Sequence, residues 1–340
     1  GYQILYRGEL IGEHYWESFH RDSLHRMYSI TKSFTSLATG LLAAEGKLGL
    51  DDRICTYFPE KLPEGGAHPW CEEMTIRDLL TMRTCYESTT FKRYDGDWVE
   101  SFFRVTPDHV PGTVFNYDTS ASHVLAALVE KLTGMDMLDY LRKKVLRRVG
   151  FSEEAYILKD PYGVSQGGSG LVSKLSDLAG IAMLCCRGGV LGGEQLIPAD
   201  FLREATACQV PTNLQPTFDE QLGYGFMMWK TRYDGFAFYG MGGQLALCYP
   251  ERDLVFLTMA DTIGNPAGLQ MIYDCFYDTV YPAVTGMPEY TNTQKLPAGE
   301  RRRGVEHWHF YGMQDKAGAA CDSSGWETVV FDWEQRIIIL

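Results

Sequence analysis

A serine and a lysine three positions apart, Ser29 and Lys32, stand where an apolar helical pattern begins. A serine hydroxyl attacks a carbonyl group only when a base removes its proton, and a lysine can be that base when burial or nearby cations lower its pKa. Residues three apart on a helix lie on one face, about one turn apart, so the two side chains can meet. At the first turn, free backbone N–H groups and the helix dipole favour a developing oxyanion. The simpler alternative is an N-cap serine followed by a solvated lysine, and a chain this long contains roughly one Ser-x-x-Lys by chance.

The element that must position this pair is a helix over residues 29–45. Its apolar residues recur at helical spacing, and Gly46 follows as a C-cap. The same periodicity predicts further helices over residues 74–82, 120–133, 136–149, 176–187 and 266–281. Residues 83–115 are rich in aromatic, charged and turn-forming residues, which indicates a substrate-facing excursion.

Strand patterns lie on either side of the helical region. They cover residues 2–7, 9–19, 236–240, 244–249 and 254–261. The order of strands, a helical middle, strands and a final helix predicts an α+β fold. In this fold an antiparallel sheet is flanked by helices and carries a mostly helical insertion.

We expect one main domain, residues 1–284, whose helical subdomain covers about residues 55–220. Residues 285–304 are polar and rich in turn formers, which is typical of a linker. Residues 305–340 resemble the strands of a small extension, and they end on the apolar run IIIL. Because an apolar strand needs a partner, we expect this extension to be cut short.

Composition restricts the classes of function. The chain carries 45% hydrophobic and 22% charged residues, as globular proteins do. No run reaches the roughly 20 apolar residues that span a bilayer, so we expect no membrane span. The net charge of −13 repels phosphate backbones, so we expect no nucleic-acid partner.

Cysteine and histidine spacing gives no indication of a metal site. No two of the nine cysteines have the CxxC spacing of zinc or redox sites, and the pair His307 and His309 has no third ligand in view. We therefore expect neither a metal nor a cofactor. Several cysteines stand in apolar runs, which indicates a reducing, cytoplasmic compartment. Gly1 opens directly on a strand-like run, so the N-terminus could be trimmed.

The stretch over residues 25–54 resembles the active-site helix of the serine β-lactamase and penicillin-binding-protein-like hydrolases, most closely the class C β-lactamase and esterase branch. In that family an S-x-x-K opens a helix that ends in G-K-L-x-L-D-D, and GKLGLDD stands at residues 46–52. Later segments match in the same order: TIRDLLTM at 75–82, PGTVFNYDTSASHVLAALVEKLTGM at 111–135, GSGLVSKLSDLAGIAMLCCRGG at 168–189 and LGYGFMMW at 222–229. The resemblance runs from about residue 2 to residue 283. It implies the fold of that family and a covalent acyl-enzyme on Ser29.

The second signature of the family, Tyr-x-Asn, is met by Tyr117, Asp118 and Thr119. The matched position implies that Tyr117 shuttles protons near Lys32, whose positive charge would favour the phenolate. The alternative for Tyr117 is a core tyrosine with a satisfied hydroxyl. Thr119 replaces an asparagine that orients substrate and lysine; since a hydroxyl reaches less far, we expect substrate positioning to differ. We expect Asp118 to face solvent.

The third signature of the family is Lys-Thr-Gly or His-x-Gly on the strand beside the nucleophile. It falls on Gly240, Met241, Gly242 and Gly243, and glycines suit a strand whose backbone approaches substrate closely. Met241 replaces the cation that helps β-lactamases to hold a substrate carboxylate, which argues against penicillin hydrolysis as the main activity. The resemblance implies oxyanion donors at the backbone N–H groups of Ser29 and about Met241, in a register that could differ by one or two residues.

Taken together, these patterns predict a serine hydrolase in which Ser29 attacks and in which Lys32 and Tyr117 manage the proton. The expected substrate is a small ester or amide, D-amino-acid peptides included, in a pocket shaped by residues 86–115 and Tyr224. The alternative is a non-catalytic binding or sensing module of the same fold, which the departures in the second and third signatures motivate. The complete catalytic set argues against that alternative.

Overall fold

The structure, a computed structural model, describes residues 1–265, 267–286, 330–332 and 337–339. It divides the chain into a larger unit, Gly1–Leu214 with Asp219–Asp261, and a smaller unit, Gln215–Phe218 with Thr262–Leu340. The domain boundary expected near residue 284 stays a prediction, because the expected linker lies almost wholly outside the described residues.

A six-stranded antiparallel sheet organises the larger unit, with the strand order β2-β1-β11-β10-β9-β8. Its strands are β1 (Tyr2–Tyr6), β2 (Glu9–His14), β8 (Trp229–Lys230), β9 (Phe236–Gly240), β10 (Gln244–Tyr249) and β11 (Leu254–Thr258). Strand β1 pairs with β11, so that Tyr2 lies opposite Thr258. Strands from before and after the helical region therefore share one sheet, which confirms the α+β prediction. Strand β2 ends at His14 rather than at residue 19.

The helices of the larger unit are α1 (Ile30–Ala44), α2 (Pro69–Glu73), α3 (Ile76–Leu80), α4 (Trp98–Arg104), α5 (Thr119–Thr133), α6 (Met137–Lys144), α7 (Leu175–Cys186) and α8 (Ala199–Thr206). Short 3₁₀ helices include η5 (Asp219–Leu222) and η7 (Pro250–Arg252). Three short strands, β3 (His25–Arg26), β5 (Leu171–Ser173) and β4 (Tyr156–Ile157), form a small sheet in that order. Strands β6 (Val190–Leu191) and β7 (Glu194–Gln195) form a hairpin.

The smaller unit carries α9 (Gly268–Cys275), a π-helical turn (Phe276–Val280) and α10 (Tyr281–Thr285). These three elements follow one another without a break from Gly268 to Thr285. The sequence predicts a single helix over residues 266–281 of this segment. Strands β12 (Val330–Asp332) and β13 (Ile337–Ile339) pair antiparallel. Both lie within residues 305–340, which the sequence predicts to contain strands.

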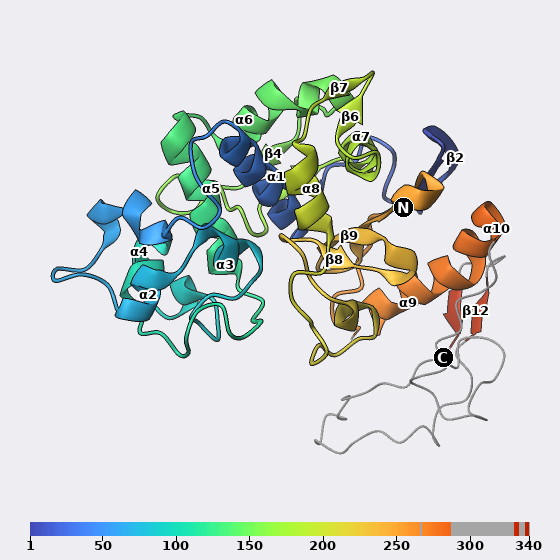
Figure 1. Ribbon diagram of the computed structural model, residues 1–340. Helices are drawn as coiled ribbons and strands as arrows, with labels where there is room; N and C mark the ends of the chain where they lie inside the picture. Colours follow the sequence, from blue (N-terminus) through green and yellow to red (C-terminus); the bar gives the residue numbers. More distant parts are fainter. Residues whose placement is uncertain (266, 287–329, 333–336, 340) are drawn as a thin grey trace, which may run out of the picture. The chain divides into compact units, whose positions relative to one another are not determined.

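Helix α1 is buried along almost its whole length, from Ile30 to Leu42. It packs against α5, α6, α8 and β9, and Figure 1 shows it beside α5 and α6. The contact with α8 is close at Gly40, where a Cβ atom would lie 2.3 Å from the Phe201 ring. Because every side of the helix meets protein, Lys32 is carried into the interior.

Among the described residues, no helix is both long enough and apolar enough to cross a membrane. The eight cysteines of the described part of the chain are free thiols, and six of them are buried.

Candidate active site

The backbone turns sharply just before Ser29. Strand β3 leads into Tyr28, whose φ of 47° is in the left-handed region that non-glycine residues rarely adopt. Ser29 follows as the N-cap residue of α1, half-buried, and its side chain makes no capping hydrogen bond. The simpler sequence interpretation, an ordinary N-cap serine, therefore does not describe this residue, and its hydroxyl is available for another partner.

That partner is Lys32, which is 1% exposed. Its Nζ atom lies 3.0 Å from Ser29 Oγ, 3.3 Å from Thr119 Oγ1 and 2.8 Å from the Gly168 carbonyl oxygen. Burial lowers the pKa of the Lys32 ammonium to about 7, while the negative charge of Asp118 acts in the opposite direction. A large fraction of Lys32 is thus neutral near pH 7 and able to accept a proton from Ser29.

Tyr117 completes this group. Its ring centroid lies 4.7 Å from Lys32 Nζ. Burial raises the pKa of Tyr117 above its ordinary value, although the nearby Ser29 side chain lowers this pKa in part. The structure therefore differs from the expectation that the lysine favours a phenolate: burial raises the pKa of Tyr117, so that Tyr117 is a neutral phenol that can donate a proton.

Tyr224 lies behind Tyr117 and not on an open surface. It is 1% exposed, and its ring meets those of Tyr117, Phe115 and Trp229 at centroid distances of 6.2, 5.2 and 4.8 Å. Because Tyr224 is buried against Tyr117, its ring supports Tyr117, and the expectation that Tyr224 shapes the pocket stays a prediction.

Thr119 and Gly168 hold the lysine from the other side. The Thr119 hydroxyl reaches Lys32 even though it is shorter than the asparagine of the resembling family. A Cβ atom at Gly168 would lie 2.4 Å from Thr119 Cγ2, so only glycine lets this carbonyl approach the ammonium. The sequence analysis assigned no role to Gly168, although it is the first residue of the matched segment 168–189; a glycine inside a matched segment was the available signal.

The expectation that Asp118 faces solvent is wrong. The residue is completely buried. Asp118 is the N-cap of α5, and its carboxylate accepts hydrogen bonds from the backbone N–H of Ser120 at 2.8 Å and from the Ser120 hydroxyl. Burial raises the pKa of the Asp118 carboxyl to about 6. Asp118 thus places a titratable charge inside the protein where it acts on Lys32.

The glycine-rich third signature forms the turn between β9 and β10. Gly242 and Gly243 have φ values of 86° and 87°, which suit glycine alone, and Met241 is 50% exposed. A Cβ atom at Gly240 would lie 2.2 Å from the carbonyl oxygen of Met27, two residues before the nucleophile. This end of β9 therefore lies beside the nucleophile segment, and Gly240 is needed for that contact within the protein.

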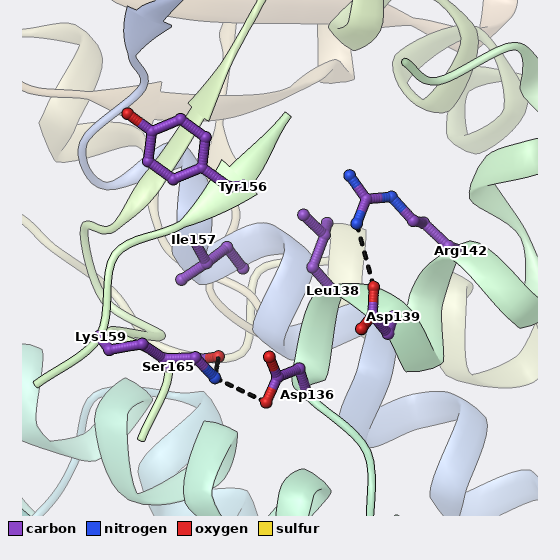
Figure 2. A pocket seen from close by; sticks show the side chains of 8 residues that line it. All are labelled: Asp136, Leu138, Asp139, Arg142, Tyr156, Ile157, Lys159 and Ser165. Carbon is purple, nitrogen blue, oxygen red and sulfur yellow. Dashed lines mark hydrogen bonds and ion pairs between the residues drawn. The ribbon is translucent and has the colours of Figure 1, made fainter. Parts of the chain in front are cut away.

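A separate hollow of about 150 Å³, open to solvent, lies along α6 and β4 (Figure 2). Its charged side chains are paired with one another: Arg142 with Asp139 at 3.0 Å, and Lys159 with Asp136 at 2.7 Å. None of the three proposed catalytic residues lines it. We therefore place the candidate active site at Ser29 and not in this hollow.

In the part of the chain that the structure describes, no group of three or more His, Cys, Asp or Glu side chains could hold a metal ion. The histidine pair at 307 and 309 lies outside the described residues.

Comparisons with known proteins place these features in a wider group. A model of the family described as Beta-lactamase matches residues 2–270. The 6-aminohexanoate-dimer hydrolase of Paenarthrobacter ureafaciens is 23% identical over 221 residues, covering 60% of this chain. The match spans 56% of the length of that relative.

Solved structures share the fold at lower identity. A Bacillus anthracis protein provisionally assigned as a 6-aminohexanoate-dimer hydrolase has a TM-score of 0.71 at 19% identity, covering 84% of this chain and 80% of its own. A penicillin-binding protein homologue from Caulobacter crescentus has a TM-score of 0.61 at 16% identity, covering 80% and 90%. EstCE1, a hydrolase with promiscuous acyltransferase activity, also has a TM-score of 0.61 at 16% identity, covering 76% and 87%.

Proposed function

Since this chain belongs to the Beta-lactamase family, whose model matches residues 2–270, we propose that it is a serine hydrolase that forms an acyl-enzyme on Ser29. The observation that carries the proposal is the 3.0 Å contact between Ser29 Oγ and Lys32 Nζ. The lysine is buried, and its pKa of about 7 makes it a competent base near neutral pH.

The proposed reaction begins with neutral Lys32, which accepts the Ser29 proton while Oγ attacks the substrate carbonyl carbon. The resulting oxyanion is held by the backbone N–H of Ser29, at the N-terminus of α1, and by one near Met241. The proton on Lys32 then passes to the leaving oxygen or nitrogen, directly or through the Tyr117 phenol. The carbonyl forms again, the C–O or C–N bond breaks, and the acyl group stays on Ser29. Water repeats the sequence and releases the acid.

The substrate class that we propose is a small ester or amide, D-amino-acid peptides included. Met241 stands where β-lactamases carry a cation, so recognition of a β-lactam carboxylate loses a main contact, and β-lactam hydrolysis is not the proposed main activity. A relative named as a 6-aminohexanoate-dimer hydrolase is consistent with this class. The alternative of a non-catalytic binding or sensing module predicts no covalent chemistry at Ser29.

A fluorophosphonate probe tests the proposal directly. We expect the folded protein to react once per chain, and mass spectrometry of the digest should locate the adduct on the peptide that contains Ser29. A panel of p-nitrophenyl esters, D-amino-acid amides and nitrocefin then ranks the substrates. A correctly folded protein that neither reacts with the probe nor hydrolyses any of these compounds would support the binding module instead.

Replacing Asp118 by asparagine is expected to shift the acid limb of the pH profile of kcat/KM to lower pH. The Asp118 charge raises the pKa of Lys32, so its removal lets the lysine stay neutral at lower pH. Asparagine can still accept from the Ser120 backbone N–H, so the cap of α5 is kept. The exposed Asp200→Asn is the matched control and should leave the limb in place. An acid limb that moves to higher pH, or that stays at the same pH, would contradict the assigned role of Asp118.

A further inference from the structure

The Gly168 carbonyl oxygen, which accepts from the lysine ammonium at 2.8 Å, lies between two anchored residues. The Thr35 hydroxyl of α1 donates to the carbonyl oxygen of Gly167 at 2.7 Å. Arg26 of β3 donates to Ser169, from Nε to the carbonyl oxygen at 3.0 Å and from Nη2 to Oγ at 3.4 Å. Because the residues on both sides of Gly168 are fixed, the direction of its carbonyl group is fixed as well.

Arg26 also contacts the turn that presents the nucleophile. Its guanidinium carbon Cζ lies 5.1 Å from the ring centroid of Tyr28, within the range of a cation–π interaction. Tyr28 directly precedes Ser29, and its φ of 47° is a conformation that persists only with support from its surroundings. One side chain therefore joins the turn before the serine to the segment that holds the lysine.

The two contacts of Arg26 suit an arginine and no other residue. A guanidinium is planar, so it donates hydrogen bonds along its edge while its face packs on an aromatic ring, whereas a lysine ammonium is a compact point charge. Within the described residues Arg26 has no carboxylate partner, and both of its hydrogen bonds go to Ser169. Arg26 therefore fixes a segment of backbone and does not neutralise an acidic side chain.

We propose that Arg26 is a positioning residue, which holds the Gly168 carbonyl against Lys32 and the Tyr28 turn beneath Ser29. The inference rests on the serine hydrolase function proposed above and adds a residue to the same site. Arg26 acts through the lysine and the serine, so its loss should slow the attack of Ser29 on any acyl donor. Misplacement of a catalytic group by about 1 Å can lower a rate about 10²-fold.

Replacing Arg26 by methionine removes the hydrogen bonds and the cation while it keeps an unbranched side chain. We expect the second-order rate constant for fluorophosphonate labelling, and kcat/KM for the best p-nitrophenyl ester, to fall about 10- to 100-fold. Labelling should still reach one adduct per chain at long times. That full stoichiometry, together with a thermal melt, shows that the slow variant is folded.

The pH profile separates positioning from a general loss of structure. A carbonyl that accepts from an ammonium favours the charged lysine, so a displaced Gly168 carbonyl lowers the pKa of Lys32, and the acid limb should move to lower pH. Two titratable groups beside Lys32 stay unchanged in this variant: Asp118, whose charge acts to raise the lysine pKa, and Tyr117, a neutral phenol. A partly unfolded protein would instead lose activity by the same factor at every pH.

Two further variants isolate the contacts of Arg26. Arg26→Lys keeps the charge and one donor but not the planar edge and face, so its rate and its acid limb should lie between those of wild type and Arg26→Met. It gives the same comparison if the methionine variant does not fold. Arg7→Met is the matched control, because the Arg7 guanidinium also lies over a tyrosine ring, that of Tyr6 at 4.9 Å. Arg7 follows β1 at the end that pairs with Leu254, away from Gly240, and its loss should leave the rate and the limb unchanged.

The outcomes distinguish this inference from the proposed function. Labelling of Ser29 in the wild-type protein, at a rate that Arg26→Met keeps, would overturn the role of Arg26 and leave the serine hydrolase standing. A lower rate with the acid limb at its wild-type pH would overturn it as a general loss of structure. A limb that moves to higher pH would overturn it as well, because the charge of Arg26 and not its hydrogen bonds would then act on Lys32. A folded wild-type protein that is not labelled would remove the serine hydrolase function and the role of Arg26 with it.

Discussion

Replacing Ser29 by alanine is expected to abolish ester hydrolysis, a loss of roughly 10⁴- to 10⁶-fold in kcat/KM. The reason is that Oγ is the atom that would bond to the acyl carbon, and alanine leaves Lys32 without a proton to take. Labelling by a fluorophosphonate should be lost as well. The measurement is the initial rate with the best p-nitrophenyl ester of the panel, together with a thermal melt.

Ser36 provides the matched control for this substitution. It lies on the same helix, it is buried, and within the described structure its hydroxyl has no hydrogen-bond partner. Ser36→Ala should therefore keep full activity, and its melting temperature should be unchanged or higher, because an unsatisfied buried hydroxyl is removed. If Ser36→Ala lost as much activity as Ser29→Ala, damage to α1 would explain both losses.

Thr119 is the alternative nucleophile if Ser29→Ala keeps some activity. Its hydroxyl also lies within hydrogen-bonding distance of Lys32, at 3.3 Å. If activity persists in Ser29→Ala and disappears in the double variant with Thr119→Val, Thr119 is the nucleophile and our assignment of Ser29 is wrong.

Replacing Lys32 by methionine is expected to lower kcat/KM by about 10²- to 10⁴-fold, the usual contribution of a general base. Methionine fills a similar buried volume without a charge, so the fold should be retained.

The pH profile of kcat/KM for the wild-type protein tests the same role of Lys32. Below the Lys32 pKa of about 7 the amine is protonated and cannot accept the Ser29 proton, so activity should fall roughly tenfold for each pH unit. Profiles of kcat/KM from pH 5 to 9 measure both effects.

Two further substitutions show whether the loss is specific to the base. Lys32→Arg keeps a positive charge that does not titrate in this range, so it should be as inactive as Lys32→Met. Lys143→Met removes an exposed lysine from α6 and should change neither the rate nor the profile. An acid limb that is still present in Lys32→Met would mean that another group sets it, and the assignment of Lys32 as base would be wrong.

The long helices were the most predictable part of the fold. Helices α1, α5 and α7 are 12 to 15 residues long and lie within a residue or two of their predicted bounds, because their apolar residues repeat over several turns. Helices α2, α4 and α8 have five to eight residues and were not predicted, whereas α3 and α6, which are as short, lie inside the longer segments 74–82 and 136–149 that predict helices. Tertiary packing stabilises such short helices, and local pattern does not reveal it.

The sequence by itself determined what depends on neighbours along the chain. Ser29 and Lys32 are one helical turn apart, so their meeting follows from helix geometry, and the ordered matches downstream identified Tyr117, Thr119 and the glycine turn. Only the tertiary structure decided how basic the lysine is. Its burial, the Gly168 carbonyl and the Asp118 charge come from segments 86 to 136 positions away. Desolvation and charge act through space, so they depend on which distant segments pack together and cannot be read from spacing.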